Sequence, residues 1–128
     1  MRVPYEYALI RVVPSVPRGE FLNVGVLLFC EARSVLCATI ELDEARLTAL
    51  HPGVDLSLVR RHLAGFECVC RGDANAGPVG ELPLRERWRW LTAPRNTILQ
   101  TSPAHGGVAD DLDALVEHIL ACAVRCPT

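Results

Sequence analysis

An uninterrupted apolar run, Val24–Cys30, limits most strongly what this chain can fold into. A strand with one solvated face alternates apolar and polar residues, whereas this run leaves no position for solvent on either face. We therefore expect a strand over 21–30 in the interior of a sheet. Segments 5–14 and 35–42, rich in β-branched and aromatic residues, predict strands on either side of it in the sequence. Their short connections favour an antiparallel meander.

The middle of the chain predicts two helices. Asp43 can cap a short helix that ends before the sequence His51-Pro-Gly. Asp55 or Ser57 can cap a longer one. Its core face consists of apolar residues that repeat at helical spacing, namely Leu56, Val59, Leu63 and Phe66.

The last third of the chain is less regular. The glycine-rich stretch 72–80 predicts a loop, and 97–101 predicts a strand followed by a loop over 102–107. Residues 83–91 fit either a helix or a strand, and Pro83 at the first position favours the helix. Asp110 or Asp111 can cap a terminal helix. Its predicted core stripe is Leu112, Leu115, Val116, Ile119, Ala123 and Cys126.

The order of these elements predicts an α+β fold. Strands come first and helices later, in contrast to the alternation typical of parallel sheets. We expect an antiparallel sheet of three to four strands, beginning with an N-terminal meander and covered by three to four helices. The 128 residues are of the length expected for a single domain over 1–128.

Charge and targeting signals narrow the possible partners. The net charge is -2 and the isoelectric point is about 6.1, which argues against nucleic-acid binding. The N-terminus lacks the apolar core of a signal peptide, and no run is long enough to span a membrane. We therefore expect a cytoplasmic protein. Walker, dinucleotide-binding and zinc-protease motifs are absent from the sequence, so we expect no cofactor.

The six cysteines lack the spacing of a zinc site. In the cytoplasm they are expected to be reduced and to act as small apolar residues in the core. His118, Cys122 and Cys126 succeed one another at four-residue spacing on the terminal helix, which would also suit a metal. Because both cysteines fall within or beside the predicted apolar stripe, we favour core packing and expect no metal.

Arg11, Glu20 and Asn23 form the first candidate site. A hairpin of the first two strands would bring Arg11 near Asn23, with Glu20 at the mouth of the loop. A half-buried arginine requires a carboxylate partner. The group is either an anion-binding or peptide-binding site or a structural ion pair that stabilises the hairpin, and the second interpretation is favoured.

The segment 93–107 is the most polar part of the chain and forms the second candidate. It places Arg95, Gln100, Ser102 and His105 on one short strand and the adjoining loops, where binding residues often occur. Ser102 and His105 could act as nucleophile and base, but the nucleophile-elbow motif is absent from the sequence. The alternative is that both side chains stabilise the loop.

Arg87 and Trp90, in the sequence Arg85-Glu-Arg-Trp-Arg-Trp90, form a candidate interface. Arginine next to an aromatic residue can bind single-stranded nucleic acid, but neighbouring glutamates dilute the charge. An amphipathic element that buries Trp88 and leaves the arginines solvated is favoured. An exposed Trp90 would suit a protein interface, where tryptophan and arginine are enriched.

Three groups of residues together resemble a bacterial family known as domain of unknown function 3037. The first is Tyr5-x-Tyr7 with Arg11-x-x-Pro14, and the second is Gly19-Glu20-x-x-Asn23-Val24-Gly25-Val26. The third runs from Trp90-Leu91-x-Ala93-Pro94-Arg95 through Thr97 and Gln100 to Ser102-Pro103-x-His105. The resemblance carries no established activity. Some members are encoded beside HipA-like kinases, which implies a protein partner of that kind.

Two functional hypotheses follow. The first is a non-catalytic binding or adaptor domain that acts with a protein partner. The second is a small enzyme or ligand-binding protein in which one polar pocket is built from Arg11, Glu20, Asn23, Arg95, Gln100 and His105. Convergence of those side chains on one concave surface would favour the second hypothesis.

Overall fold

The computed structural model describes residues 1–127, and its centre is an antiparallel sheet. Strands β1 (Val3–Val12), β2 (Leu22–Cys30) and β3 (Val35–Ile40) form the predicted meander, with β2 between the other two. Every residue from Val24 to Cys30 is buried, as their apolar character predicts. The fold is therefore of the α+β class.

Two short strands pair with the edge of β1 that faces away from β2. β4 (Leu99–Thr101) pairs with the end of β1, and β5 (His105–Ala109) pairs with its beginning. The prediction of a loop over 102–107 was wrong at β5. Glycines 106 and 107 give this segment little intrinsic strand preference, and pairing with β1 determines its conformation. A Cβ at Gly107 would lie 2.5 Å from the hydroxyl of Tyr5, so any other residue there would require the Tyr5 ring to move.

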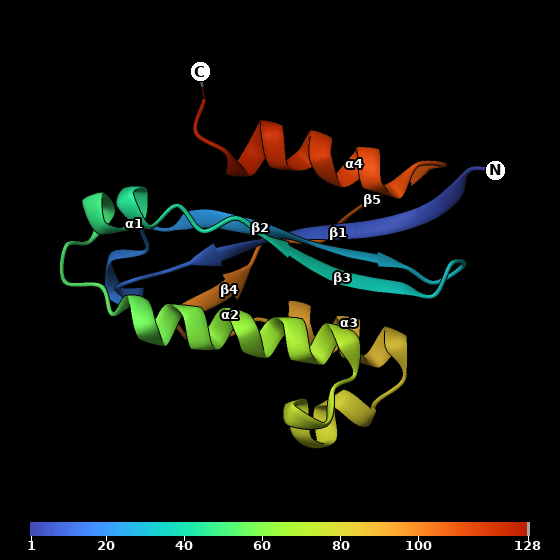
Figure 1. The fold of residues 1–128 in the computed structure, drawn as a ribbon, viewed down its shortest axis with the longest axis horizontal. Coiled ribbons are helices and arrows are strands. Elements are labelled where there is room, and N and C mark those ends of the chain that lie inside the picture. Colours follow the sequence, from blue (N-terminus) through green and yellow to red (C-terminus); the bar gives the residue numbers. More distant parts are fainter. Residues whose placement is uncertain (128) are drawn as a thin grey trace.

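Helices cover both faces of the sheet (Figure 1). Helices α2 (Leu56–Arg71) and α3 (Leu84–Thr92) lie on one face, and α4 (Leu112–Ile119) lies on the other. The short α1 (Glu44–Leu50) follows β3. Asp43, Asp55 and Asp111 each accept a hydrogen bond from a backbone N–H in the first turn of α1, α2 and α4, as predicted.

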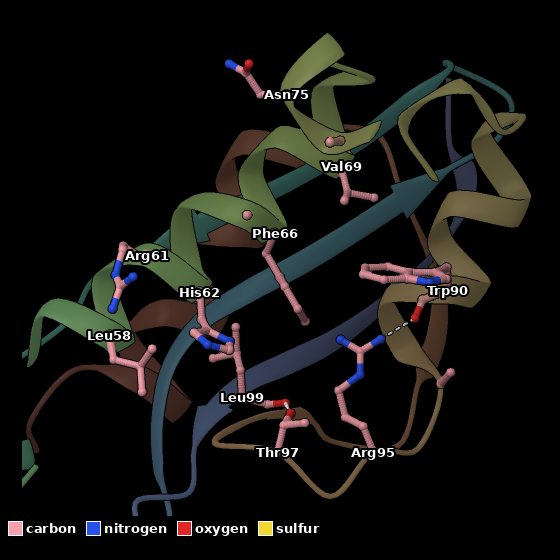
Figure 2. A pocket seen from close by; sticks show the side chains of 13 residues that line it. Leu58, Arg61, His62, Phe66, Val69, Asn75, Trp90, Arg95, Thr97 and Leu99 are labelled. Atoms are coloured by element: carbon pink, nitrogen blue, oxygen red, sulfur yellow. Dashed lines mark hydrogen bonds between the residues drawn. The ribbon is translucent and has the colours of Figure 1, made fainter. Parts of the chain in front are cut away.

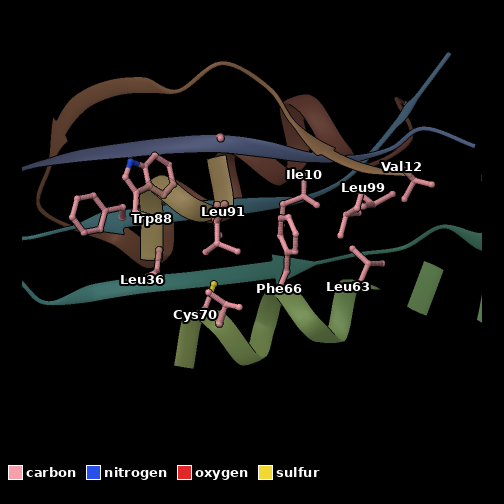
Figure 3. Close-up of a cluster of buried hydrophobic side chains, with 14 of the residues drawn as sticks. Ile10, Val12, Leu36, Leu63, Phe66, Cys70, Trp88, Leu91 and Leu99 are labelled. Atoms are coloured by element: carbon pink, nitrogen blue, oxygen red, sulfur yellow. The ribbon is translucent and has the colours of Figure 1, made fainter. Parts of the chain in front are cut away.

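The larger core lies between the sheet and the α2–α3 layer (Figure 3). Leu63 and Phe66 from α2 and Leu91 from α3 pack against Ile10 of β1 and the residues around it. Trp88 is buried, and its ring stacks on Phe29 with 5.6 Å between centroids. The preference for a helix over 83–91, with Trp88 in its core face, is confirmed.

The terminal helix differs from the prediction at its end. The predicted stripe continued through Ala123 to Cys126, but Cys126 and Cys122 are exposed, and Val124 is buried instead. A wide π turn over Leu120–Val124 adds a residue to the last turn and rotates the buried face, because the N–H of Arg125 donates to the carbonyl of Leu120. The prediction that both cysteines pack in the core was wrong.

Two further features complete the chain. The predicted loop 72–80 contains 3₁₀ turns over Ala74–Glu81, interrupted at Gly77, and loop 15–20 contains a short 3₁₀ turn at Val16–Arg18. Within residues 1–127, no helix combines the length and apolar character needed to cross a membrane.

Candidate functional site

A cavity between α2 and α3, here called the α2–α3 pocket, has a volume of about 640 Å³. It is closed at one end by the loop 93–97 and by β4. Phe66, Val69 and Leu99, all buried, form its apolar floor. The remaining lining residues are polar, small or partly exposed, namely Leu58, Arg61, His62, Gly65, Asn75, Ala76, Trp90, Ala93, Arg95 and Thr97.

Arg95 lies between the two aromatic side chains of this pocket. Figure 2 shows Phe66 from α2, Trp90 from α3 and Arg95 from the following loop pointing toward one another. The guanidinium carbon lies 4.8 Å from the centroid of the Trp90 ring and 5.2 Å from that of Phe66. One N–H of Arg95 donates to the carbonyl of Trp90 at 2.5 Å. Stacking and this hydrogen bond orient the guanidinium without a carboxylate.

The charge of the pocket is uncompensated. Within residues 1–127, none of the lining residues is acidic, and Arg61 and Arg95 have no carboxylate within ion-pair distance. Burial lowers the pKa of Arg95 from its ordinary value because desolvation disfavours the charged form. Arg60, next to Arg61 on α2, instead forms a bidentate pair with Glu44. The pocket therefore presents positive charge to whatever enters it.

One helical stripe of α2 forms the wall of the pocket. Leu58, Arg61, His62, Gly65 and Phe66 follow one another at the spacing that places residues on one side of a helix. Gly65 is unusual because a glycine within a helix costs about 0.5–1 kcal/mol relative to alanine. A Cβ at Gly65 would meet no atom within 4 Å, so packing among residues 1–127 does not require glycine at this position.

Three of the predicted site residues form a row across the opposite face of the sheet. Arg11 on β1 is the register partner of Asn23 on β2 and of Gln100 on β4. The Asn23 amide donates to the carbonyl of Ala123, which places the row on the α4 face. The Arg11 guanidinium lies 4.0 Å from the centroid of the Phe21 ring. In the described part of the chain, the buried Arg11 Nε and Asn23 Oδ1 have no hydrogen-bond partner.

The other predicted site residues lie elsewhere. Glu20 pairs with Arg18 at 2.7 Å in the exposed β1–β2 loop. Within residues 1–127, Arg11 forms no ion pair, so the favoured interpretation of a structural ion pair between Arg11 and a carboxylate was wrong. His105 opens β5 opposite Tyr7, with 5.3 Å between ring centroids. Ser102 is buried between β4 and β5, where its Oγ accepts from the N–H of Leu9 at 2.8 Å and donates to the carbonyl of Pro103 at 2.9 Å. Its hydroxyl continues the hydrogen bonding of β1 across the gap between the two strands.

The six residues of the hypothesised polar pocket therefore do not converge. Arg95 lines the α2–α3 pocket, whereas Arg11, Asn23 and Gln100 lie on the other face of the sheet. The prediction that Arg11 lies near Asn23 is confirmed. The sequence alone does not show that the loop carrying Arg95 turns toward α2.

The two interface candidates have different environments. Trp90 is 41% exposed at the rim of the pocket. Arg87 is half-buried and donates to the carbonyls of Val69, Cys70 and Leu82 at 2.8–3.0 Å. The expectation that the arginines of this segment stay solvated was wrong for Arg87, because the end of α2 leaves carbonyl groups without helical partners.

Sequence reasoning missed the contribution of α2 to the pocket, including Arg61, His62 and Gly65. A signal was present. A cation, an imidazole and a glycine occupy one stripe of an otherwise amphipathic helix, where a fully packed face would carry apolar residues. The segment 93–107, which is the most polar part of the chain, carries the stronger sequence signal.

The residues of the pocket are suited to binding. Its one hydroxyl group, on Thr97, donates to the carbonyl of Leu99 at 2.9 Å, and its one imidazole is His62.

Among residues 1–127, no group of three or more histidine, cysteine, aspartate or glutamate side chains could hold a metal ion. Burial raises the pKa of Cys37, and raises that of Cys70 to about 12, which keeps these thiols protonated and unreactive.

Comparison with known proteins gives one match. The family model described as "Protein of unknown function (DUF3037)" covers residues 7–124. No curated protein and no solved structure matches the chain. The matched region extends from β1 to the last turn after α4 and therefore includes the whole α2–α3 pocket. The chain belongs to the DUF3037 family.

Proposed function

We propose that this protein is a non-catalytic binding domain whose α2–α3 pocket receives an apolar side chain from a protein partner. The observation that carries the proposal is a cavity of about 640 Å³ with an apolar floor and a basic, aromatic rim. Cavities of this size are typical of binding sites. Tryptophan and arginine, which meet at this rim, are the residues that most often dominate the energetics of protein interfaces.

A partner segment suits the site better than an enclosed small molecule. Small ligands are usually surrounded over most of their surface. Here the rim is open to solvent, and Trp90 is 41% exposed beside Arg95. A side chain that enters from a larger body would cover Trp90 and exclude water from the contact. The family resemblance makes a HipA-like kinase the first partner to examine.

A substitution at Gly65 can fill the pocket without disturbing the core. Because a Cβ there meets no atom within 4 Å, Gly65→Phe is expected to place its ring in the cavity and to abolish partner binding. Ala64→Phe is the matched control, since Ala64 is an exposed neighbour on α2 that does not line the pocket. Capture from a lysate of the source organism, followed by quantitative mass spectrometry, should identify proteins retained by the parent chain and by Ala64→Phe but lost from Gly65→Phe.

The same position also provides a measurement of stability. Gly65→Ala removes the entropic cost of a glycine within a helix and introduces no contact closer than 4 Å. We expect it to raise the free energy of unfolding by about 0.5–1 kcal/mol in a denaturant titration. Identical capture by the parent chain, Ala64→Phe and Gly65→Phe would contradict the proposed function, and a destabilised Gly65→Ala would show that the position is not open.

A further inference from the structure

We propose that the α2–α3 pocket selects a peptide segment in which an acidic side chain lies next to an aromatic or large aliphatic one, with Arg95 binding the carboxylate. The inference rests on the proposed function and adds to it the chemical class of the partner segment. It depends on three features of the pocket: the unused donors of Arg95, the unbalanced charge and the open backbone at Gly65.

Arg95 has hydrogen-bonding capacity that residues 1–127 do not use. A guanidinium carries five N–H donors in a planar fork that matches a carboxylate. Among residues 1–127, the acceptor found for Arg95 is the carbonyl of Trp90, which engages one nitrogen. Stacking against Trp90 and Phe66 fixes the plane of the fork before any ligand arrives. A carboxylate can therefore bind with little loss of side-chain entropy.

The surrounding charges favour an anion. Most other half-buried or exposed arginines of this chain are satisfied by its own carboxylates or carbonyls. Arg60, Arg85 and Arg125, for example, each pair with glutamates. Arg61 and Arg95 face a cavity without an acidic lining residue within the described chain. A partly desolvated cation without a counter-charge is costly, and an incoming carboxylate would supply the missing partner.

The apolar part of the segment has a defined place. Phe66, Val69 and Leu99 present the floor, and the bare backbone at Gly65 allows a ring or a branched aliphatic group to lie directly against α2. The floor and Arg95 belong to the same cavity, so one peptide can reach both with adjacent residues. This juxtaposition favours a segment with one acidic and one apolar side chain over a purely acidic one.

The experiment uses short capped glycine-rich peptides with a fluorophore, in which one phenylalanine is followed by glutamate, glutamine or lysine. Binding is followed by fluorescence anisotropy. For the parent chain, we expect the glutamate peptide to bind about tenfold more tightly than the glutamine peptide, as for a charge-assisted hydrogen bond. The lysine peptide should bind more weakly still. Arg95→Gln should remove the preference, and Arg95→Lys should keep part of it because the charge remains. Arg89→Gln, which changes an exposed arginine on the preceding helix α3 outside the pocket, should leave the preference intact.

Each outcome separates the two proposals. Equal binding of the glutamate and glutamine peptides, or equal losses in Arg95→Gln and Arg89→Gln, would overturn the acidic-segment inference while leaving an apolar pocket in place. Phenylpropionate that displaces the glutamate peptide at equal concentration would assign the pocket to a small organic acid and would also overturn it. Unchanged binding of every peptide to Gly65→Phe would instead contradict the proposed function, because the peptides would then be bound elsewhere.

Discussion

Replacement of Leu63 by alanine is expected to lower the free energy of unfolding by about 2–5 kcal/mol. Leu63 is 4% exposed and lies on the face of α2 that packs against the sheet. Truncation removes apolar contacts and leaves a cavity that the rigid sheet can refill only in part. The measurement is the midpoint and slope of a urea unfolding curve, with an unchanged slope showing that the native state is retained.

A second leucine serves as the comparison. Leu115 lies on α4 at the other face of the sheet and is only partly buried, so Leu115→Ala should cost less than Leu63→Ala. If the two variants unfold at the same denaturant concentration as the parent chain, the assignment of these helices to the two faces of the sheet is wrong.

Replacement of Arg87 by alanine is expected to be the second large effect, with a loss of roughly 2–4 kcal/mol in unfolding free energy. The guanidinium donates to three carbonyl groups, two at the end of α2 and one before α3. Without it, these half-buried acceptors lose charge-assisted hydrogen bonds, and the connection between the two helices loosens. Since residues of α2 and α3 line the α2–α3 pocket, partner binding should weaken as well.

Arg89→Ala is the matched control for this effect. Arg89 is exposed on the same helix, and its replacement should change stability by no more than about 0.5 kcal/mol. If Arg87→Ala weakened partner binding with no change in thermal or denaturant stability, Arg87 would be an interface residue rather than a structural one.

The parts of the fold that depend on local patterns were predictable. The apolar run Val24–Cys30 favoured an interior strand, and the structure buries all of it between two helical layers. Asp43, Asp55 and Asp111 precede helical periodicity and cap the helices that follow. In each case the residues that predict the element lie within it or directly before it. Sequence periodicity and capping rules are therefore enough to predict these strands and helices.

Features that depend on distant partners were not predictable in this way. β5 forms because β1 offers it a free edge, although its glycines disfavour a strand. The π turn after α4 changes which residues are buried, and no residue type in that segment predicts it. The pocket itself requires the loop after α3 to turn toward α2, so that Arg95 and Gly65, thirty positions apart in the sequence, line the same cavity. The candidate residues were chemically sensible, but their grouping into one site depended on tertiary structure.

The most direct test is NMR spectroscopy of the isotope-labelled protein during titration with the phenylalanine–glutamate peptide. The chemical shifts of the backbone amides and of the tryptophan indole N–H groups are followed. We expect saturable changes centred on Gly65, Arg95 and the indole N–H of Trp90, and their loss in the Gly65→Phe variant. Changes centred instead on Arg11 and Phe21, on the opposite face of the sheet, would contradict the claim that the α2–α3 pocket is the binding site.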